Sequence, residues 1–184
     1  MCTAANDQAG SMRILSDKGL LALIQGEYEQ ARVILTEALE IDQAQALSPA
    51  SGYVRCYLGF ATLLVGETEA AGDHLRDGVR LQRLREDNLG LMYLAIGLSG
   101  VANRYCNYVR AATLVGAANR LQSDAGTQLV PASKDAFDRE IGIMQEALGP
   151  QRFLQAWAAG VAMTLDETIE FALEPDTPLD NETD

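Results

Sequence analysis

The residue of this 184-residue chain best suited to acid–base or metal chemistry is His74, its only histidine. Asp73 and Asp77 flank it, so the three side chains could share a metal ion or a proton. Metal sites built on histidine combine it with further His or Cys ligands at regular spacing, and none stands near His74. The spacing therefore favours a solvent-facing histidine over a metal ligand or general base.

Two further patterns approach catalytic motifs without completing them. Residues 97–100 read Gly-Leu-Ser-Gly, one residue short of the GxSxG turn that exposes a nucleophilic serine, and they lie inside a predicted helix. Ser99 is therefore interpreted as a small contact residue. The chain has no GxxxxGK sequence followed by Ser or Thr, so it lacks the loop with which an NTPase binds phosphate. ATP hydrolysis by this chain is not expected.

The acidic residues near the C-terminus and the single tryptophan have structural explanations. Asp166, Glu167 and Glu170 open a predicted helix, where carboxylates interact favourably with the helix dipole. Trp157 stands at helical spacing from Phe153, which predicts a core anchor rather than a ligand platform. The sequence thus predicts no catalytic residue, no metal ligand and no cofactor.

Composition and charge restrict the partners. The formal net charge is −12, and residues 166–184 hold eight acidic residues and no basic one. Such a balance repels phosphate backbones, so we expect no direct binding of nucleic acid. The basic run at Arg76, Arg80, Arg83 and Arg85 has the spacing of a solvated helix stripe.

Cysteine usage and hydropathy indicate the compartment. The three cysteines, Cys2, Cys56 and Cys106, have no CxxC spacing, which predicts neither a disulfide nor a zinc site and favours a reducing environment. Cys56 and Cys106 are interpreted as small buried hydrophobes. The chain has neither a basic start followed by an apolar run nor 18 consecutive apolar residues, so we expect a cytoplasmic protein without a membrane partner.

The elements that position these residues follow a 40-residue period. Gly26 and Gly66 are 40 residues apart, and Cys106 holds the third equivalent place. Small residues recur at this spacing where two backbones would come close, and large apolar residues recur where a core needs filling. The small set is Gly19, Gly59 and Ser99, and the large set is Leu35, Leu75 and Val115. Such a period is typical of stacked supersecondary units.

The apolar spacing is helical throughout, which predicts an all-α solenoid of three helix pairs with a three-helix C-terminal cap. We expect a single domain over residues 12–173. It consists of three units, 12–47, 48–87 and 88–126, and a cap, 133–173. The leader 1–11 and the acidic tail 174–184 are expected to be disordered.

Local signals define the cap. Gly149-Pro150 is expected to end one helix and start the next, and Thr164 with Glu167 forms a capping-box pattern. We expect Phe153 and Trp157 to cover the apolar end of the third unit, because terminal repeats need a polar outer face.

The first unit resembles the tetratricopeptide repeat. In the run QGEYEQARVILTEALEID and just before it, the residues at that repeat's spacings are Gly19, Gly26, Tyr28, Ala31, Leu35 and Ala38. The second unit has Thr68 for the usual aromatic residue, and the third has Cys106 for the turn glycine. The resemblance implies antiparallel helix pairs whose first helices line a concave groove.

The resemblance also implies a set of groove residues on the first helix of each unit. These are Arg13, Leu20 and Ile24, then Tyr53, Phe60 and Leu64, then Tyr93, Ile96, Asn103 and Arg104. A largely apolar groove with tyrosines suits an apolar helix or peptide segment. The alternative is that these residues fill the interior of a tightly wound superhelix.

A narrower resemblance covers residues 53–173. The run RAATLVGAANRLQ and the stretch F-x-x-A-W-x-x-G-x-x-M-T-L-D-E, from Phe153 to Glu167, are similar to the C-terminal helical-repeat region of bacterial signal-transduction NTPase regulators, which often end in a LuxR-type DNA-binding module. Neither the NTPase part nor the DNA-binding part is present in this sequence. The resemblance implies a non-catalytic interaction or sensor module of a bacterial transcriptional or signal-transduction system.

Three function classes stay open. The groove binds a peptide or partner domain, or it holds a small-molecule inducer, which an enclosed apolar pocket of at least ~300 Å³ would favour. The third class, an enzyme, requires convergent polar groups that the sequence does not offer. The occupant of a peptide groove could be a partner segment, a second copy of the chain, or the acidic tail folded back onto Arg13 and Arg104.

Overall fold

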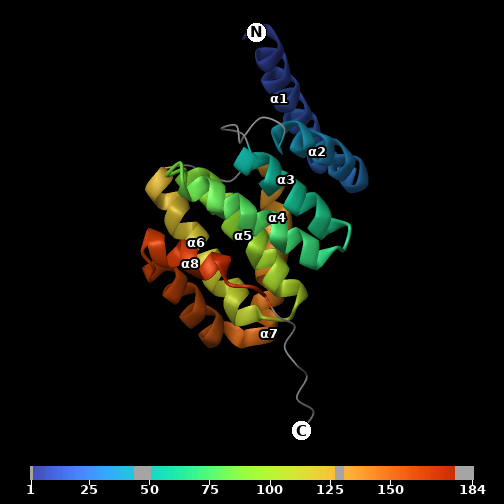
Figure 1. Ribbon diagram of the computed structural model, residues 1–184. Coiled ribbons are helices and arrows are strands. Elements are labelled where there is room, and N and C mark those ends of the chain that lie inside the picture. Colours follow the sequence, from blue (N-terminus) through green and yellow to red (C-terminus); the bar gives the residue numbers. More distant parts are fainter. Residues whose placement is uncertain (1, 44–50, 127–130, 177–184) are drawn as a thin grey trace. The chain divides into compact units, whose positions relative to one another are not determined.

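The computed structural model describes residues 2–43, 51–126 and 131–176, and all regular structure in these ranges is helical, which confirms the all-α prediction. The helices are α1 (Cys2–Gln25), α2 (Tyr28–Gln43), α3 (Ser51–Leu64), α4 (Thr68–Arg83), α5 (Asn88–Arg104), α6 (Tyr108–Ala125), α7 (Pro131–Ala162) and α8 (Leu165–Leu173), as shown in Figure 1. Across the described ranges, none of these helices combines the length and the apolar character that crossing a membrane requires.

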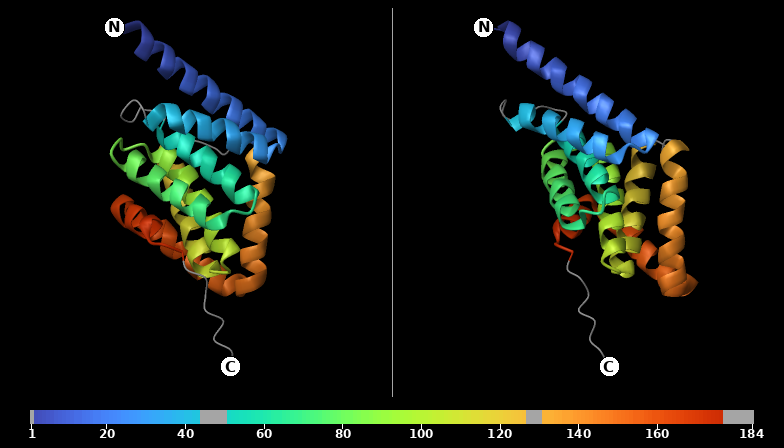
Figure 2. Two further views of the ribbon diagram at one scale, coloured as in Figure 1. Left: turned by 45° about the vertical axis from the view of Figure 1, so that its right-hand side comes forward. Right: turned by 90° about the vertical axis from the view of Figure 1, so that its right-hand side faces the viewer.

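The chain divides into two compact units, residues 1–85 with α1–α4 and residues 86–184 with α5–α8. In the first unit α1 packs on α2 and α3, and α3 packs on α2 and α4. In the second unit α6 packs on both α5 and α7, while α8 contacts α5 and α6. Figure 2 shows the helices of each unit side by side. The single domain over residues 12–173 stays a prediction.

The turn inside each helix pair repeats one backbone geometry every 40 residues. Gly26, Gly66 and Cys106 have φ angles of 80°, 96° and 59°, in the left-handed region. Each donates its N–H to the carbonyl three residues back at 3.0–3.1 Å, and the next residue donates to the carbonyl five residues before it at 2.9–3.0 Å. This pair of bonds satisfies the free carbonyls of a helix end. The sequence period is therefore also a period of backbone geometry.

In the first unit each small residue of the period faces a leucine of the second helix. A Cβ atom placed on Gly59 would lie 2.7 Å from Cδ2 of Leu75, and one placed on Gly19 would meet the side chain of Leu35. Both leucines are fully buried. We expected backbones to come close at these glycines. The space instead holds the leucine side chain, which explains why small and large residues recur with the same period.

Two backbones do come close in the second unit, between α6 and the end of α7. A Cβ atom on Gly160 would overlap the carbonyl oxygen of Thr113, and one on Gly116 would overlap that of Trp157. Atoms of the main chain cannot move aside as a flexible side chain can. The glycine in the stretch F-x-x-A-W-x-x-G therefore allows this part of α7 to lie directly on α6.

The local signals of the cap are confirmed. Gly149 has φ 71° and ψ 161°, so α7 consists of two helical segments that meet at Gly149-Pro150. The hydroxyl of Thr164 accepts from the Glu167 N–H at 3.3 Å, and the Glu167 carboxylate accepts from the Thr164 N–H at 2.7 Å, as a capping box requires. Phe153 is buried in a cluster with Ala111, whereas Trp157 packs against that cluster and is only half-buried.

The structure differs from the predicted bounds at both ends. Helix α1 begins at Cys2 rather than Met12, because alanine and glutamine favour helix even where the apolar stripe has ended. At the other end, Glu174 and Asp176 of the expected disordered tail are bound to Arg110. Residue 1 and residues 177–184, the rest of the two expected ends, lie outside the described ranges.

We predict that Gly160→Ala lowers the free energy of unfolding by about 2–3 kcal/mol, because its methyl group meets main-chain atoms that cannot yield. Gly142→Ala in the same helix is the matched control. A Cβ there meets nothing within 4 Å, so the helix gains up to about 1 kcal/mol from the better helix former. Urea unfolding followed by Trp157 fluorescence measures both. Equal stability of the two variants would show that the helices can separate without cost.

At the third turn we predict that Cys106→Gly is more stable than Cys106→Ala by about 0.5–1 kcal/mol, because only glycine adopts a left-handed φ without a clash of its Cβ. The alanine variant keeps the clash and loses the thiol, so it is the proper reference. Urea unfolding of the two variants measures the difference. A difference below the error of the measurement would contradict the interpretation.

Candidate functional site

In the first unit the predicted groove residues lie on the solvent-facing sides of α1 and α3. The exposed members are Arg13, Ile24 and Leu64, and the half-buried members are Leu20, Tyr53 and Phe60. Ile24 is 57% exposed and Leu64 is 43% exposed. Large apolar side chains at this exposure keep much of their surface in water, so a partner that covered them would gain free energy.

Helix α3 carries an aromatic stripe that the predicted set contained only in part. Tyr53, Tyr57, Phe60 and Leu64 recur at the spacing of one helix face. The rings of Tyr53 and Tyr57 have centroids 6.2 Å apart, within the range of favourable aromatic pairs. Tyr57 also packs on the core cluster of the first unit. Its position one helical turn after Tyr53 was a signal that could have placed it in the set.

In the second unit the predicted groove residues are engaged by the chain itself. The Asn103 side chain is buried and donates to the Glu140 carboxylate at 2.6 Å and to its carbonyl at 3.2 Å. Arg104 lies 3.5 Å from the same carboxylate. Glu140 belongs to α7 and was missed by the sequence reasoning, because an acidic residue on a cap helix carries no local signal of a tertiary contact. Tyr93 is half-buried on α5.

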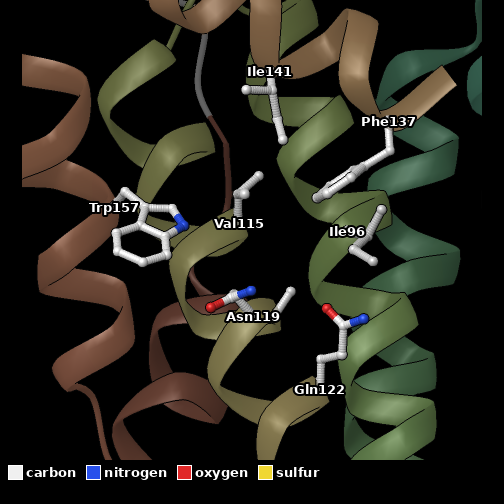
Figure 3. A pocket seen from close by; sticks show the side chains of 8 residues that line it. Ile96, Val115, Asn119, Gln122, Phe137, Ile141 and Trp157 are labelled. Carbon is white, nitrogen blue, oxygen red and sulfur yellow. The ribbon is translucent and has the colours of Figure 1, made fainter. Parts of the chain in front are cut away.

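Ile96, the remaining predicted residue, lines a cavity of about 80 Å³ in the second unit. Val115, Phe137, Ile141 and Trp157 form its apolar walls, and Asn119 and Gln122 contribute amide groups, as Figure 3 shows. Ligand pockets for drug-sized molecules start at about 300 Å³. This cavity is therefore too small to favour an inducer-binding site.

A wider depression lies in the first unit beside the first turn. Its volume is about 450 Å³, and residues 26–30 with Val65 line it. It is open to solvent rather than enclosed, so it does not meet the condition set for a small-molecule receptor. Tyr28, the aromatic residue of the repeat pattern, forms part of its wall.

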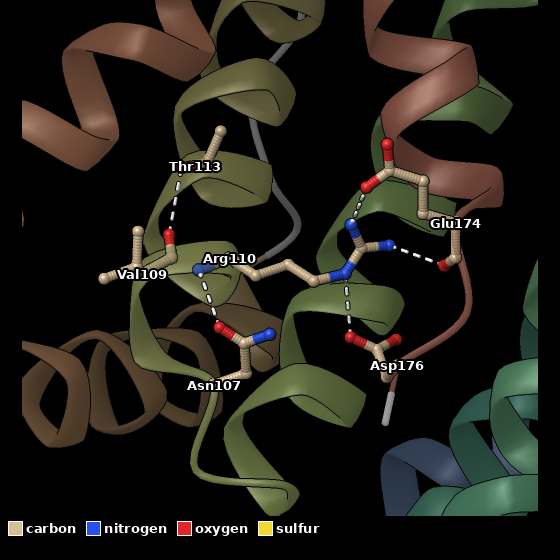
Figure 4. A network of polar contacts seen from close by, with 6 residues as sticks. All are labelled: Asn107, Val109, Arg110, Thr113, Glu174 and Asp176. Carbon is tan, nitrogen blue, oxygen red and sulfur yellow. Dashed lines mark hydrogen bonds and ion pairs between the residues drawn. The ribbon is translucent and has the colours of Figure 1, made fainter. Parts of the chain in front are cut away.

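A buried cation, Arg110, joins α6 to the segment that follows α8. Its side chain is 7% exposed and donates from Nε to Asp176 Oδ1 at 2.8 Å, from Nη1 to Glu174 Oε2 at 3.1 Å and from Nη2 to the Glu174 carbonyl at 2.7 Å. Its Cζ lies 4.6 Å from the centroid of the Phe171 ring, a cation–π distance. Figure 4 shows the polar contacts.

Sequence reasoning missed Arg110 as a site residue, although it opens the run RAATLVGAANRLQ. The acidic tail was expected to reach Arg13 or Arg104, yet its first carboxylates bind Arg110. The signal that could have identified it is a lone arginine among small apolar residues, which cannot be buried without a carboxylate partner. Which carboxylate it finds depends on the fold, because more than 60 residues separate the two.

His74 is half-buried rather than solvent-facing. Burial and the nearby positive charge of Arg55 lower the pKa of His74, and the carboxylates of Asp77, Asp73 and Glu67 oppose them. Arg55 is held by Asp77, with Nη1 3.2 Å from Oδ2. Within the described residues no group of three His, Cys, Asp or Glu side chains is placed to hold a metal ion.

One arginine of the basic stripe and one of the two internal cysteines differ from expectation. The Arg76 side chain is only 12% exposed and pairs with Asp73 at 2.9 Å, so the interpretation as a solvated stripe is wrong at that residue. Arg80, Arg83 and Arg85 are exposed as expected. Cys56 is buried, and burial raises the pKa of its thiol. Cys106 is exposed, because its turn position faces solvent.

No protein-family model, curated protein or solved structure matches this chain.

We predict that the wild type loses stability relative to His74→Gln as the pH falls below about 6.5, the ordinary pKa of histidine. The folded state lowers the pKa of His74, so the unfolded chain takes up the proton first and acidification favours unfolding. Melting temperatures of both proteins between pH 7.5 and 5 measure this loss of stability. The comparison isolates His74, because the other titrating side chains are the same in the two proteins. A difference that does not change with pH would contradict the buried setting of His74.

Proposed function

We propose that this chain is a tetratricopeptide-like module of a bacterial regulatory system, which binds a peptide or a partner domain on the apolar face of its first unit and performs no catalysis. The observation that carries the proposal is the exposure of Ile24 and Leu64. Both stand at positions where the repeat contacts its ligands.

The repeated turn geometry supports a tetratricopeptide-like arrangement. The left-handed residue and its two hydrogen bonds recur at Gly26, Gly66 and Cys106. The alanines five residues after them, Ala31, Ala71 and Ala111, are all fully buried, as close packing of two helices requires. Small residues at the same three places make each helix pair equivalent to the next.

The chemistry of the exposed face supports a polypeptide ligand. Ile24, Leu64 and the half-buried Phe60 offer apolar area, while Tyr53 adds a ring with a polar end. An amphipathic helix recognises such a surface through apolar side chains at helical spacing. A second copy of the chain is an alternative occupant, and the experiment below separates the two.

The role in bacterial regulation is supported by the resemblance of residues 153–167 to the repeat regions of signal-transduction regulators. Gly160 of this stretch sits where α7 meets the backbone of α6, and Phe153 of the same helix is buried. The same residues thus stabilise the cap, so the resemblance concerns the scaffold of the module.

We predict that a selection of helical peptides on the wild-type chain enriches sequences with apolar residues at i, i+3/i+4 and i+7. The double variant Ile24→Glu with Leu64→Glu is expected to bind these peptides at least about 100-fold more weakly, because it places two charges where the peptide would bury apolar surface. Val33→Glu on α2 is the matched control, since Val33 is 64% exposed and lies outside the predicted groove. Fluorescence anisotropy measures the affinities.

Two other outcomes would contradict this assignment. If the selected peptides bind the double variant as well as the wild type, the exposed face of the first unit is not the binding surface. If no peptide is enriched but sedimentation shows a dimer that the double variant loses, the occupant is a second copy of the chain.

A further inference from the structure

Arg110 holds the segment after α8 as a binding site holds a peptide. The segment is extended, with Glu174 at φ −60° and ψ 136°, and Pro175 follows it. Arg110 contacts a side-chain carboxylate, a main-chain carbonyl and a second carboxylate two residues later. Combined contacts to side chain and backbone of an extended acidic segment are the pattern by which arginine sites recognise acidic peptides.

Arg110 also has contacts outside the segment, one through its backbone and one through its guanidinium. The backbone N–H of Arg110 donates to the Asn107 side chain in the first turn of α6, at 3.3 Å. The guanidinium lies over Phe171, which belongs to α8 and not to the segment. The Phe171 ring is thus a contact of the guanidinium that remains when the segment leaves.

Two carboxylates of the segment contribute unequally. The Glu174 side chain is 62% exposed, whereas that of Asp176 is fully buried. Glu174 is also the first residue after α8, and its backbone is extended rather than helical. The site therefore selects a three-residue pattern, in which an acidic residue is followed by any residue and then by an aspartate that becomes buried.

Because an arginine cannot lose its proton inside a protein, a buried Arg110 without a carboxylate would be strongly destabilising. Departure of the segment is thus coupled to the arrival of another carboxylate. This coupling turns an internal contact into an exchangeable one, since a partner that supplies the same groups replaces what the chain loses.

We propose that Arg110 with Phe171 forms a binding site for an acidic peptide of the Glu-x-Asp type from a partner protein, and that Glu174-Pro175-Asp176 is its intramolecular ligand, which the partner segment displaces. This site belongs to the second unit and the apolar face to the first, and the proposal does not depend on what that face binds.

The test uses the full chain and an unlabelled synthetic peptide with the sequence of residues 173–178, LEPDTP. In the wild type the attached segment competes at an effective concentration in the millimolar range, so peptide binding is weak. Glu174→Gln with Asp176→Asn removes this competition, and the variant is expected to bind the peptide at least about ten-fold tighter than the wild type. Binding is followed by NMR titration of the 15N-labelled protein.

Two controls establish that the carboxylates and Arg110 account for the binding. The peptide LQPNTP, which has amides for carboxylates, and the triple variant that adds Arg110→Gln are both expected to show no binding. The gain of the double variant is expected to shrink as NaCl is raised, because charge pairs weaken with ionic strength.

Two results would overturn the proposal. A double variant that binds LEPDTP no tighter than the wild type, or one that binds LQPNTP equally well, would show that the segment is a permanent part of the fold. Should the double variant prove unfolded by circular dichroism, Glu174→Gln alone decides, since that side chain is largely exposed. It is expected to bind the peptide more tightly than the wild type, and no gain would overturn the proposal.

Discussion

The helix pairs of this protein depend on a residue with left-handed φ at the end of each first helix. Reversing the chain within two or three residues leaves carbonyls of that helix without partners, and the paired hydrogen bonds at Gly26, Gly66 and Cys106 satisfy them. Such short turns bring the second helix directly against the first. The buried alanines and the glycine–leucine contacts then follow, because the helices are too close for larger residues at those positions.

This constraint explains which parts of the fold could be predicted from the sequence. Helix ends with glycine, the break at Gly149-Pro150 and the capping box at Thr164 are local, and each residue type acts through its own backbone preferences. The start of α1 could not be found in this way, because residues 2–11 carry no apolar stripe. The all-α class followed from periodicity, which is also a local property.

The contacts of the candidate sites were harder to predict, since they join residues far apart in the chain. Glu140 reaches Asn103, and Asp176 reaches Arg110, over 37 and 66 residues. Opposite charges in a sequence offer many pairings, and only packing selects among them. Burial acts in the same way on His74 and Arg76, whose spacing alone predicted exposure. Charge patterns in the sequence therefore do not determine which pairs form.

Tertiary packing also determines which of the equivalent repeat positions are exposed to a ligand. Positions equivalent in the repeat pattern have different surroundings, because α7 supplies Glu140 to Asn103 and Arg104 and places Phe137 and Ile141 around Ile96. Ile24 and Leu64 in the first unit keep about half of their surface exposed. A terminal helix that completes the core of its own unit consumes the surface that an inner repeat would offer to a partner. Peptide binding at the repeat positions is thus expected from the first unit, while in the second unit those positions contact the chain itself and the candidate site is Arg110.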